Sequence, residues 1–84
     1  MRVVSQNGDI DVPYEITAFH TCHGRIRMNM AGDAGLGTEM AVYESQLKAL
    51  KAMEYMRDAY SDFIADDSDS YAIFKFPPDY EVRL

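Results

Sequence analysis

The chain has 84 residues, and its 14 acidic and eight basic side chains give a formal net charge of −6. A chain of this length forms one domain with a modest core, and its apolar share argues against disorder. The acidic balance disfavours unaided binding to nucleic acid or to an anionic membrane, because like charges repel. Cys22 is the one cysteine, which excludes an internal disulfide and suits a reducing cytoplasm.

Export and membrane signals are not expected. The N-terminal stretch "MRVVSQNGDID" lacks the apolar run of about 7–15 residues that a secretory signal requires. No segment approaches the roughly 20 apolar residues of a membrane-spanning helix. The sequence therefore predicts a soluble cytoplasmic protein.

The first predicted element is a short hairpin near the N-terminus. Asn7-Gly8 lies between alternating segments and predicts a type I′ turn, which needs positive φ at both central residues. This register sets Val3 opposite Val12, and Pro13 ends the second strand because it has no backbone donor. The stretch holds no nucleophile beside a base, so it is interpreted as a turn.

A second hairpin is predicted with His23-Gly24 as its turn. Pairing outward from this turn sets Cys22 opposite Arg25 and continues strand by strand. One face of the hairpin is then apolar and the other polar, whereas a slip by one residue would mix the two sets. The apolar set is Phe19, Ile26, Met28 and Met30, and the polar set is His20, Cys22, Arg25, Arg27 and Asn29.

A glycine-rich loop over residues 32–37 leads into a strand over 38–44, with Met40 and Val42 on one side. Ser45 is the expected N-cap of the helix that follows, because its hydroxyl can accept from backbone N–H groups two or three residues on. Apolar residues then recur at helical spacing along one face. This stripe is formed by Ala49, Met53, Met56, Tyr60 and Phe63, with Leu50 and Ile64 beside it.

A last strand over residues 71–76 is stopped by Pro77-Pro78. The order of elements is β-β-β-β-β-α-β, with one amphipathic helix. Such a helix is expected to cover one face of a mostly antiparallel sheet. The sequence therefore predicts one α+β domain over residues 1–84, built in two layers.

His20, Cys22 and His23 raise the alternative of a zinc-binding module. Zinc takes three or four nitrogen or sulfur ligands, but in a strand only His20 and Cys22 point the same way. The arginines opposite them add positive charge where a cation would bind. Cys22 and His20 also lack the oriented third group of a nucleophilic site. We therefore expect no metal, no cofactor and no enzymatic activity.

The charges along the helix run against its dipole. Lys48 and Lys51 lie near its start, although cations are favoured at the end of a helix and anions at the start. This pattern indicates an acidic surface that recognises a basic partner, although neutral drift on a stably packed helix stays an alternative. The predicted partner-binding residues are Asp58, Asp62, Asp66, Asp67 and Asp69, with Tyr55 and Tyr71 as exposed aromatic anchors.

The polar face of the second hairpin carries a small basic patch, formed by His20, Arg25 and Arg27. This patch could sequester an anionic nucleotide signal, or it could only keep a bare sheet face soluble. A homodimer that buries this face, with Tyr14 and Ile16 at the contact, is a further alternative.

Three stretches carry a resemblance to known proteins: "MRVVSQNGDIDVPYE", residues 40–60, and "FKFPPDYEV". They resemble a family of small, mostly uncharacterised proteins of Gram-positive bacteria, their prophages and mobile elements. The resemblance implies no catalytic residues. It implies a phage setting, in which small acidic proteins act as inhibitors of bacterial defence, anti-CRISPR proteins among them. The leading hypothesis is thus a non-enzymatic inhibitor that binds a host defence protein, such as a type II CRISPR effector nuclease.

Overall fold

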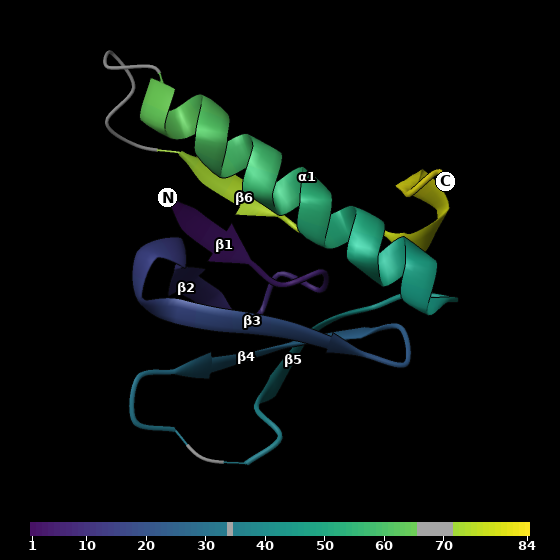
Figure 1. The fold of residues 1–84 in the computed structure, drawn as a ribbon, viewed down its shortest axis with the longest axis horizontal. Helices are drawn as coiled ribbons and strands as arrows, with labels where there is room; N and C mark the ends of the chain where they lie inside the picture. Colours follow the sequence, from purple (N-terminus) through teal and green to yellow (C-terminus); the bar gives the residue numbers. More distant parts are fainter. Residues whose placement is uncertain (34, 66–71) are drawn as a thin grey trace.

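The computed structural model describes residues 1–33, 35–65 and 72–84, and it confirms the predicted α+β class. The elements follow one another in the predicted order, with two short 3-10 helices, η1 and η2, added (Figure 1). In chain order they are β1 (Arg2–Val4), β2 (Asp11–Pro13), η1 (Tyr14–Ile16), β3 (Thr17–Cys22), β4 (Arg25–Met30), β5 (Thr38–Val42), α1 (Gln46–Ala65), β6 (Ile73–Lys75) and η2 (Asp79–Glu81).

The strands form two sheets instead of the predicted single sheet. One sheet has the strand order β2-β1-β6, and the other has the order β3-β4-β5. All neighbouring strands run antiparallel except β1 and β6, which are parallel. Pro13 ends β2 because it has no backbone donor, and η1 then redirects the chain into β3. This change of direction takes the chain from the first sheet to the second.

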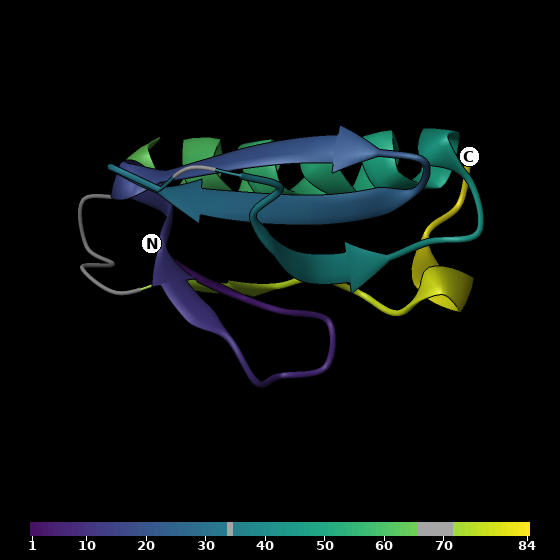
Figure 2. The ribbon, with the colours of Figure 1, turned by 90° about the horizontal axis from the view of Figure 1, so that it is seen from below.

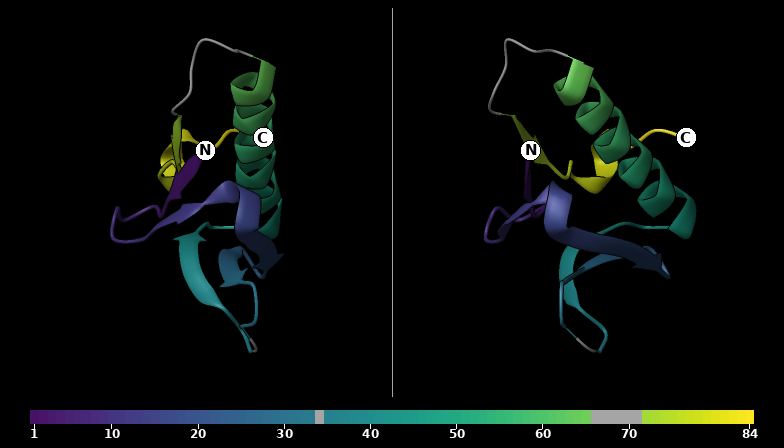
Figure 3. Two further views of the ribbon diagram at one scale, coloured as in Figure 1. Left: turned by 90° about the vertical axis from the view of Figure 1, so that its left-hand side faces the viewer. Right: turned by 60° about the vertical axis from the view of Figure 1, so that its left-hand side comes forward.

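Helix α1 covers both sheets. Figure 2 shows β3 and β4 in front of α1, and Figures 1 and 3 show β1 and β6 alongside the helix. The core between these layers takes buried side chains from both sheets, the helix and the C-terminal segment. Its members include Val3, Ile26, Met40, Ala52, Met56, Phe76 and Val82. Within the described ranges, no helix combines the length and the apolar character that a bilayer crossing needs.

The first hairpin has the predicted register but not the predicted turn. Val3 lies opposite Val12, as expected. Of the two predicted turn residues only Gly8 has positive φ, and its N–H donates to the Ser5 carbonyl at 2.9 Å. Side chains explain this wider turn: the Ser5 hydroxyl donates to Asn7 Oδ1, which also accepts from the Asp9 N–H. The type I′ prediction is therefore wrong, because Asn7 closes the turn through its side chain.

The second hairpin is confirmed in both register and turn. Cys22 lies opposite Arg25, and the pairing continues to the ends of β3 and β4 as predicted. His23 (φ 52°) and Gly24 (φ 82°) both occupy the left-handed region that a type I′ turn requires. A Cβ on Gly24 would lie 2.6 Å from the Tyr43 carbonyl oxygen, so this position demands glycine for space as well as for conformation.

A β-bulge in β5 makes one sequence prediction wrong. Ile26 of β4 pairs with Ala41, but the next residue, Arg27, pairs with Glu39. Met40 is therefore an extra residue, which breaks the alternation of the strand. As a result Met40 and Ala41 are both buried, while Val42 is 40% exposed instead of sharing the side of Met40.

The predicted N-cap of α1 is confirmed, since the Ser45 hydroxyl accepts from the Lys48 N–H at 3.2 Å. The stripe is confirmed in its centre, where Ala49 and Met56 are buried. Its predicted flank is wrong, because Leu50 and Ile64 are exposed. Ala52, which the stripe omitted, is fully buried and lets the helix approach the sheets closely.

The connection between β5 and α1, residues 42–46, joins distant parts of the chain. Gln6 holds its first residue: the Val42 N–H donates to Gln6 Oε1 at 3.0 Å, and Gln6 Nε2 donates to the Val42 carbonyl at 3.2 Å. The same Nε2 donates to the Pro77 carbonyl at 3.1 Å. Gln6 thus extends the edge of β5 with a side-chain amide and ties the two sheets together.

Hydrogen bonds also fix Tyr43 and Gln46 in the rest of the connection. The Tyr43 N–H donates to the Gly24 carbonyl, and its hydroxyl donates to the Pro77 carbonyl at 2.7 Å. Burial, with a smaller effect of Asp79, raises the pKa of Tyr43 well above its ordinary value. Gln46 accepts from the Gly24 N–H at 2.7 Å. The tip of the second hairpin is therefore fastened beneath the start of α1.

Candidate functional site

The solvent face of α1 combines apolar and acidic side chains. Glu54, Asp58 and Asp62 are exposed and recur at steps of four, so they lie on one face of the helix. Leu47 and Leu50 precede them, with exposed fractions of 65% and 47%. We call these five residues the outer helix face. At 1.5 Å per residue it extends about 22 Å from Leu47 to Asp62.

The predicted partner-binding residues fall in three places. Asp58 and Asp62 lie on the outer helix face. Tyr55 is half-buried against the core, with the Lys51 ammonium 5.8 Å from its ring centroid, so it is not the exposed anchor that the sequence suggests. Leu47 and Leu50 provide the exposed apolar surface in its place. The remaining predicted residues, Asp66, Asp67, Asp69 and Tyr71, lie outside the described residues.

The apparent charge conflict at the start of α1 is resolved by the C-terminal segment. Lys48 Nζ lies 3.0 Å from Asp79 Oδ2 and 3.6 Å from Glu44 Oε2. Its hydrogen bond to Asp79 raises the pKa of Lys48. The Glu44 N–H, followed by Lys48, lowers the pKa of Asp79. Lys48 therefore has a structural role at the start of α1. The acidic side chains near the end of the helix are still placed unfavourably for the helix dipole.

A second candidate surface is the outer face of the second hairpin. His20, Arg25 and Arg27 line a shallow hollow of about 460 Å³, together with Cys22, His23 and Leu36. His20 Nε2 lies 3.3 Å from the Leu36 carbonyl oxygen, so Leu36 helps to form the hollow. Arg25 Nη1 contacts Glu39 Oε1 at 2.5 Å, and this ion pair offsets part of the positive charge. The structure thus brings the predicted basic residues together, but with one of them already paired.

Two alternatives for this face lose support. His23 occupies the turn, and no group of three or more His, Cys, Asp or Glu side chains within residues 1–33, 35–65 and 72–84 could hold a metal. Zinc binding is therefore not proposed. Tyr14 belongs to η1 and stacks on Tyr60 of α1, with ring centroids 4.3 Å apart. Its ring packs toward the helix and is only partly exposed, so it offers less surface to the predicted dimer contact than an exposed tyrosine would, whereas Ile16 is exposed.

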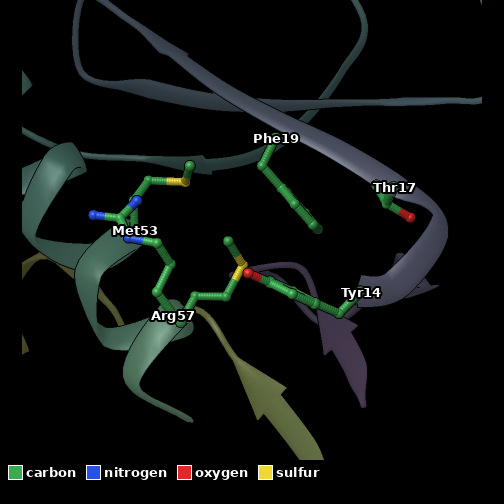
Figure 4. Close-up of a pocket in the computed structure, with 6 residues that line it drawn as sticks. Tyr14, Thr17, Phe19, Met53 and Arg57 are labelled. Atoms are coloured by element: carbon green, nitrogen blue, oxygen red, sulfur yellow. The ribbon is translucent and has the colours of Figure 1, made fainter. Parts of the chain in front are cut away.

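A third surface was not predicted: a slot of about 290 Å³ between α1 and the η1–β3 segment. Figure 4 shows Tyr14, Thr17 and Phe19 on one side and Met53 and Arg57 of the helix on the other. Met56 completes the lining. We call this site the aromatic slot. The sequence held one signal for it, since Tyr14 and Ile16 do not fit the apolar face of the second hairpin.

Comparison with protein-family models, with curated proteins and with solved structures found no match. The resemblance to small proteins of prophages and mobile elements stays a prediction. The outer helix face, the hollow on the second hairpin and the aromatic slot are therefore the three candidate sites.

Proposed function

We propose that this chain is a small non-enzymatic binding protein whose outer helix face docks on a basic surface of a partner protein. The observation that carries the proposal is the exposure of Leu47 and Leu50 beside a row of three carboxylates. These two large apolar side chains leave much of their surface in water, on a helix whose inner face is well packed. They fit the apolar centre of an interface, with the carboxylates as its charged rim.

Charge supports a basic partner. The chain carries a net charge of −6, and Lys51, three residues before Glu54 on α1, lies 3.5 Å from it in a partly exposed pair. Such a surface pair contributes little to stability, so a partner's cations can replace Lys51 at small cost. Asp58 and Asp62 repel each other at i, i+4, and a partner cation between them would relieve that repulsion. Long-range attraction would speed association, and the leucines would slow dissociation.

The acidic outer helix face fits a basic partner surface, and the resemblance suggests a target in host defence. A host defence protein with a basic nucleic-acid channel meets both conditions. A type II CRISPR effector nuclease is the specific proposal, and the protein would act in the bacterial cytoplasm as a phage or mobile-element inhibitor. A helix face about 22 Å long with spaced carboxylates can lie along a channel that otherwise holds phosphates.

The test is a DNA-cleavage assay with a purified type II effector–guide complex, at low and at physiological salt. The wild-type protein is expected to inhibit cleavage, more strongly at low salt because rim charges are screened. The Asp58→Lys/Asp62→Lys double variant should lose at least about tenfold in potency. The matched control is Asp9→Lys/Glu81→Lys, which makes the same charge change at two exposed sites off the helix.

Three results would count against this proposal. An absence of inhibition would remove the type II effector as partner. Equal losses in the two double variants would show that net charge acts instead of the outer helix face. Full potency of the Leu47→Ser/Leu50→Ser variant would show that the exposed leucines do not anchor the complex.

The hollow on the second hairpin supports a second candidate function, the sequestration of an anionic nucleotide. The supporting observation is the convergence of His20, Arg25 and Arg27 on one concave face. Calorimetry against a panel of cyclic nucleotides tests it, and Arg27→Gln is expected to abolish any heat. No heat from the wild-type protein across the panel would eliminate this candidate.

A further inference from the structure

The aromatic slot offers apolar surface that the fold leaves partly open to water. Tyr14, Phe19 and Met53 are each only half-buried, although they pack against the core. The rings of Tyr14 and Phe19 are stacked at 24°, with centroids 6.1 Å apart. Each ring has a second aromatic contact: Tyr14 stacks on Tyr60, and Phe19 packs edge-on against Phe76. The walls are therefore rigid on the strand side.

The helix side of the slot is softer. Met53 and Met56 face the aromatic rings, and thioether side chains adapt to the shape of a bound group at little cost. Sulfur also makes favourable contacts with the edges of aromatic rings. Rigid rings opposite flexible methionines form a site that accepts a flat apolar group of variable outline.

Among the residues that the structure describes, one charged side chain lines the slot, and it is a cation. Arg57 is exposed, and Figure 4 shows its side chain extending from α1 beside Met53, on the opposite side from Phe19. The lining holds no carboxylate, and the ion pairs found among the described residues do not include Arg57. In a chain of net charge −6, this places a positive charge beside the aromatic and thioether side chains of the slot.

We propose that the aromatic slot binds a small aromatic carboxylate, with the ring between Phe19 and Met53 and the carboxylate on Arg57. Guanidinium and carboxylate match in shape and charge, and the pair can form two parallel hydrogen bonds. The Thr17 hydroxyl, which donates to the Pro13 carbonyl, keeps lone pairs free to accept from a ring substituent. This proposal does not rest on the proposed partner.

The experiment uses the intact protein labelled with ¹³C at the methionine methyl groups. The probe is 1-naphthoate, and the neutral comparison is 1-naphthamide, which has the same ring but no charge. The expected result is a saturable shift of the Met53 and Met56 signals by naphthoate, with a Kd on the order of 1 mM or tighter. Met30 and Met40 lie outside the slot lining and should not move.

The Arg57→Gln variant tests the charge without removing the slot. It should weaken naphthoate binding about tenfold and leave the weak binding of naphthamide unchanged. The control is Arg83→Gln, which removes an exposed cation that does not line the slot. Unmoved Met53 and Met56 signals, or shifts shared by all methionines, would overturn the proposal. So would equal binding of naphthoate and naphthamide, since the anion would then play no part.

Discussion

The β5–α1 connection and the outer helix face are neighbours in the chain, yet they differ in how their side chains are used. In the connection, Gln6, Gly24 and Pro77 hold Val42, Tyr43 and Gln46 through backbone and side-chain hydrogen bonds. On the outer helix face, two leucines and three carboxylates face water.

The side chains of the connection are used to hold the fold together, whereas those of the outer helix face are free to contact another molecule. The three stretches that carry the resemblance meet at the connection, where Gln6, Tyr43 and Pro77 come together. Folding alone therefore accounts for these residue types. The opening Ser-Gln-Asn-Gly is a turn with a sheet-bridging glutamine. The outer helix face has no such explanation, so it is the better place to look for a partner.

The largest loss of stability is expected from a substitution at Gly24, which packs against the connection. Gly24→Ala introduces a Cβ 2.6 Å from the Tyr43 carbonyl and also places alanine at φ 82°. The expected loss of unfolding free energy is about 2–4 kcal/mol, from strain and overpacking together. Urea denaturation measures it.

The control for this prediction is Gly32→Ala. Gly32 has a similar φ of 89°, but apart from its chain neighbours no described residue has an atom within 4 Å of its Cβ position. It should cost only the conformational part, about 1 kcal/mol. Equal losses for the two variants would mean that the hairpin tip is not fastened beneath α1 in the way described.

A smaller loss is expected from Gln6→Met, which keeps the length of the side chain and removes its three hydrogen bonds. The Val42 amide and carbonyl then lose their side-chain partner, while the Pro77 carbonyl keeps its hydrogen bond from the Tyr43 hydroxyl, at a total cost of about 1–2 kcal/mol because water reaches part of this edge. For a domain of this size the melting temperature should fall by roughly 4–16 °C. A variant as stable as the wild type would show that the hydrogen bonds of the Gln6 side chain do not stabilise the contact between the two sheets.

Local patterns predicted much of the fold. The His23-Gly24 turn fixed the register of the second hairpin, because glycine and alternation agree there with the burial of one face. Ser45 and the helical spacing likewise predicted the start of α1 and the centre of its core face. These features depend on residues close in sequence, which is why the sequence alone was sufficient.

Features that depend on distant contacts could not be predicted. The Asn7 side chain replaced the expected backbone turn, and the bulge at Met40 reversed the outward side of β5. The separation into two sheets depends on β6 pairing in parallel with β1, some 70 residues away in the chain. The aromatic slot exists only because η1 turns Tyr14 toward α1, and no local pattern marks that turn.

The pH dependence of stability tests the contacts of Asp79. Its pKa is lowered below the ordinary value of 3.8 in the folded state, by the Glu44 N–H first and Lys48 second. Its stabilising effect is therefore complete above the unfolded pKa and is lost as pH falls through the folded pKa. The wild type should exceed Asp79→Asn in stability at pH 7, and the gap should narrow as pH falls below about 4. Melting curves between pH 7 and pH 2 measure the gap, and a constant difference would contradict this account.

The smallest expected effect is a gain in stability, from a substitution on the outer helix face. α1 has no basic residue in its last turn, where Asp62 lies against the helix dipole and four residues from Asp58. Asp62→Lys should therefore raise the unfolding free energy by about 0.5–1 kcal/mol, measured by urea denaturation. If the same variant binds its partner less well, the carboxylate costs stability and is retained for recognition. A variant that gains stability without losing binding would instead favour neutral drift on a helix held by its inner face.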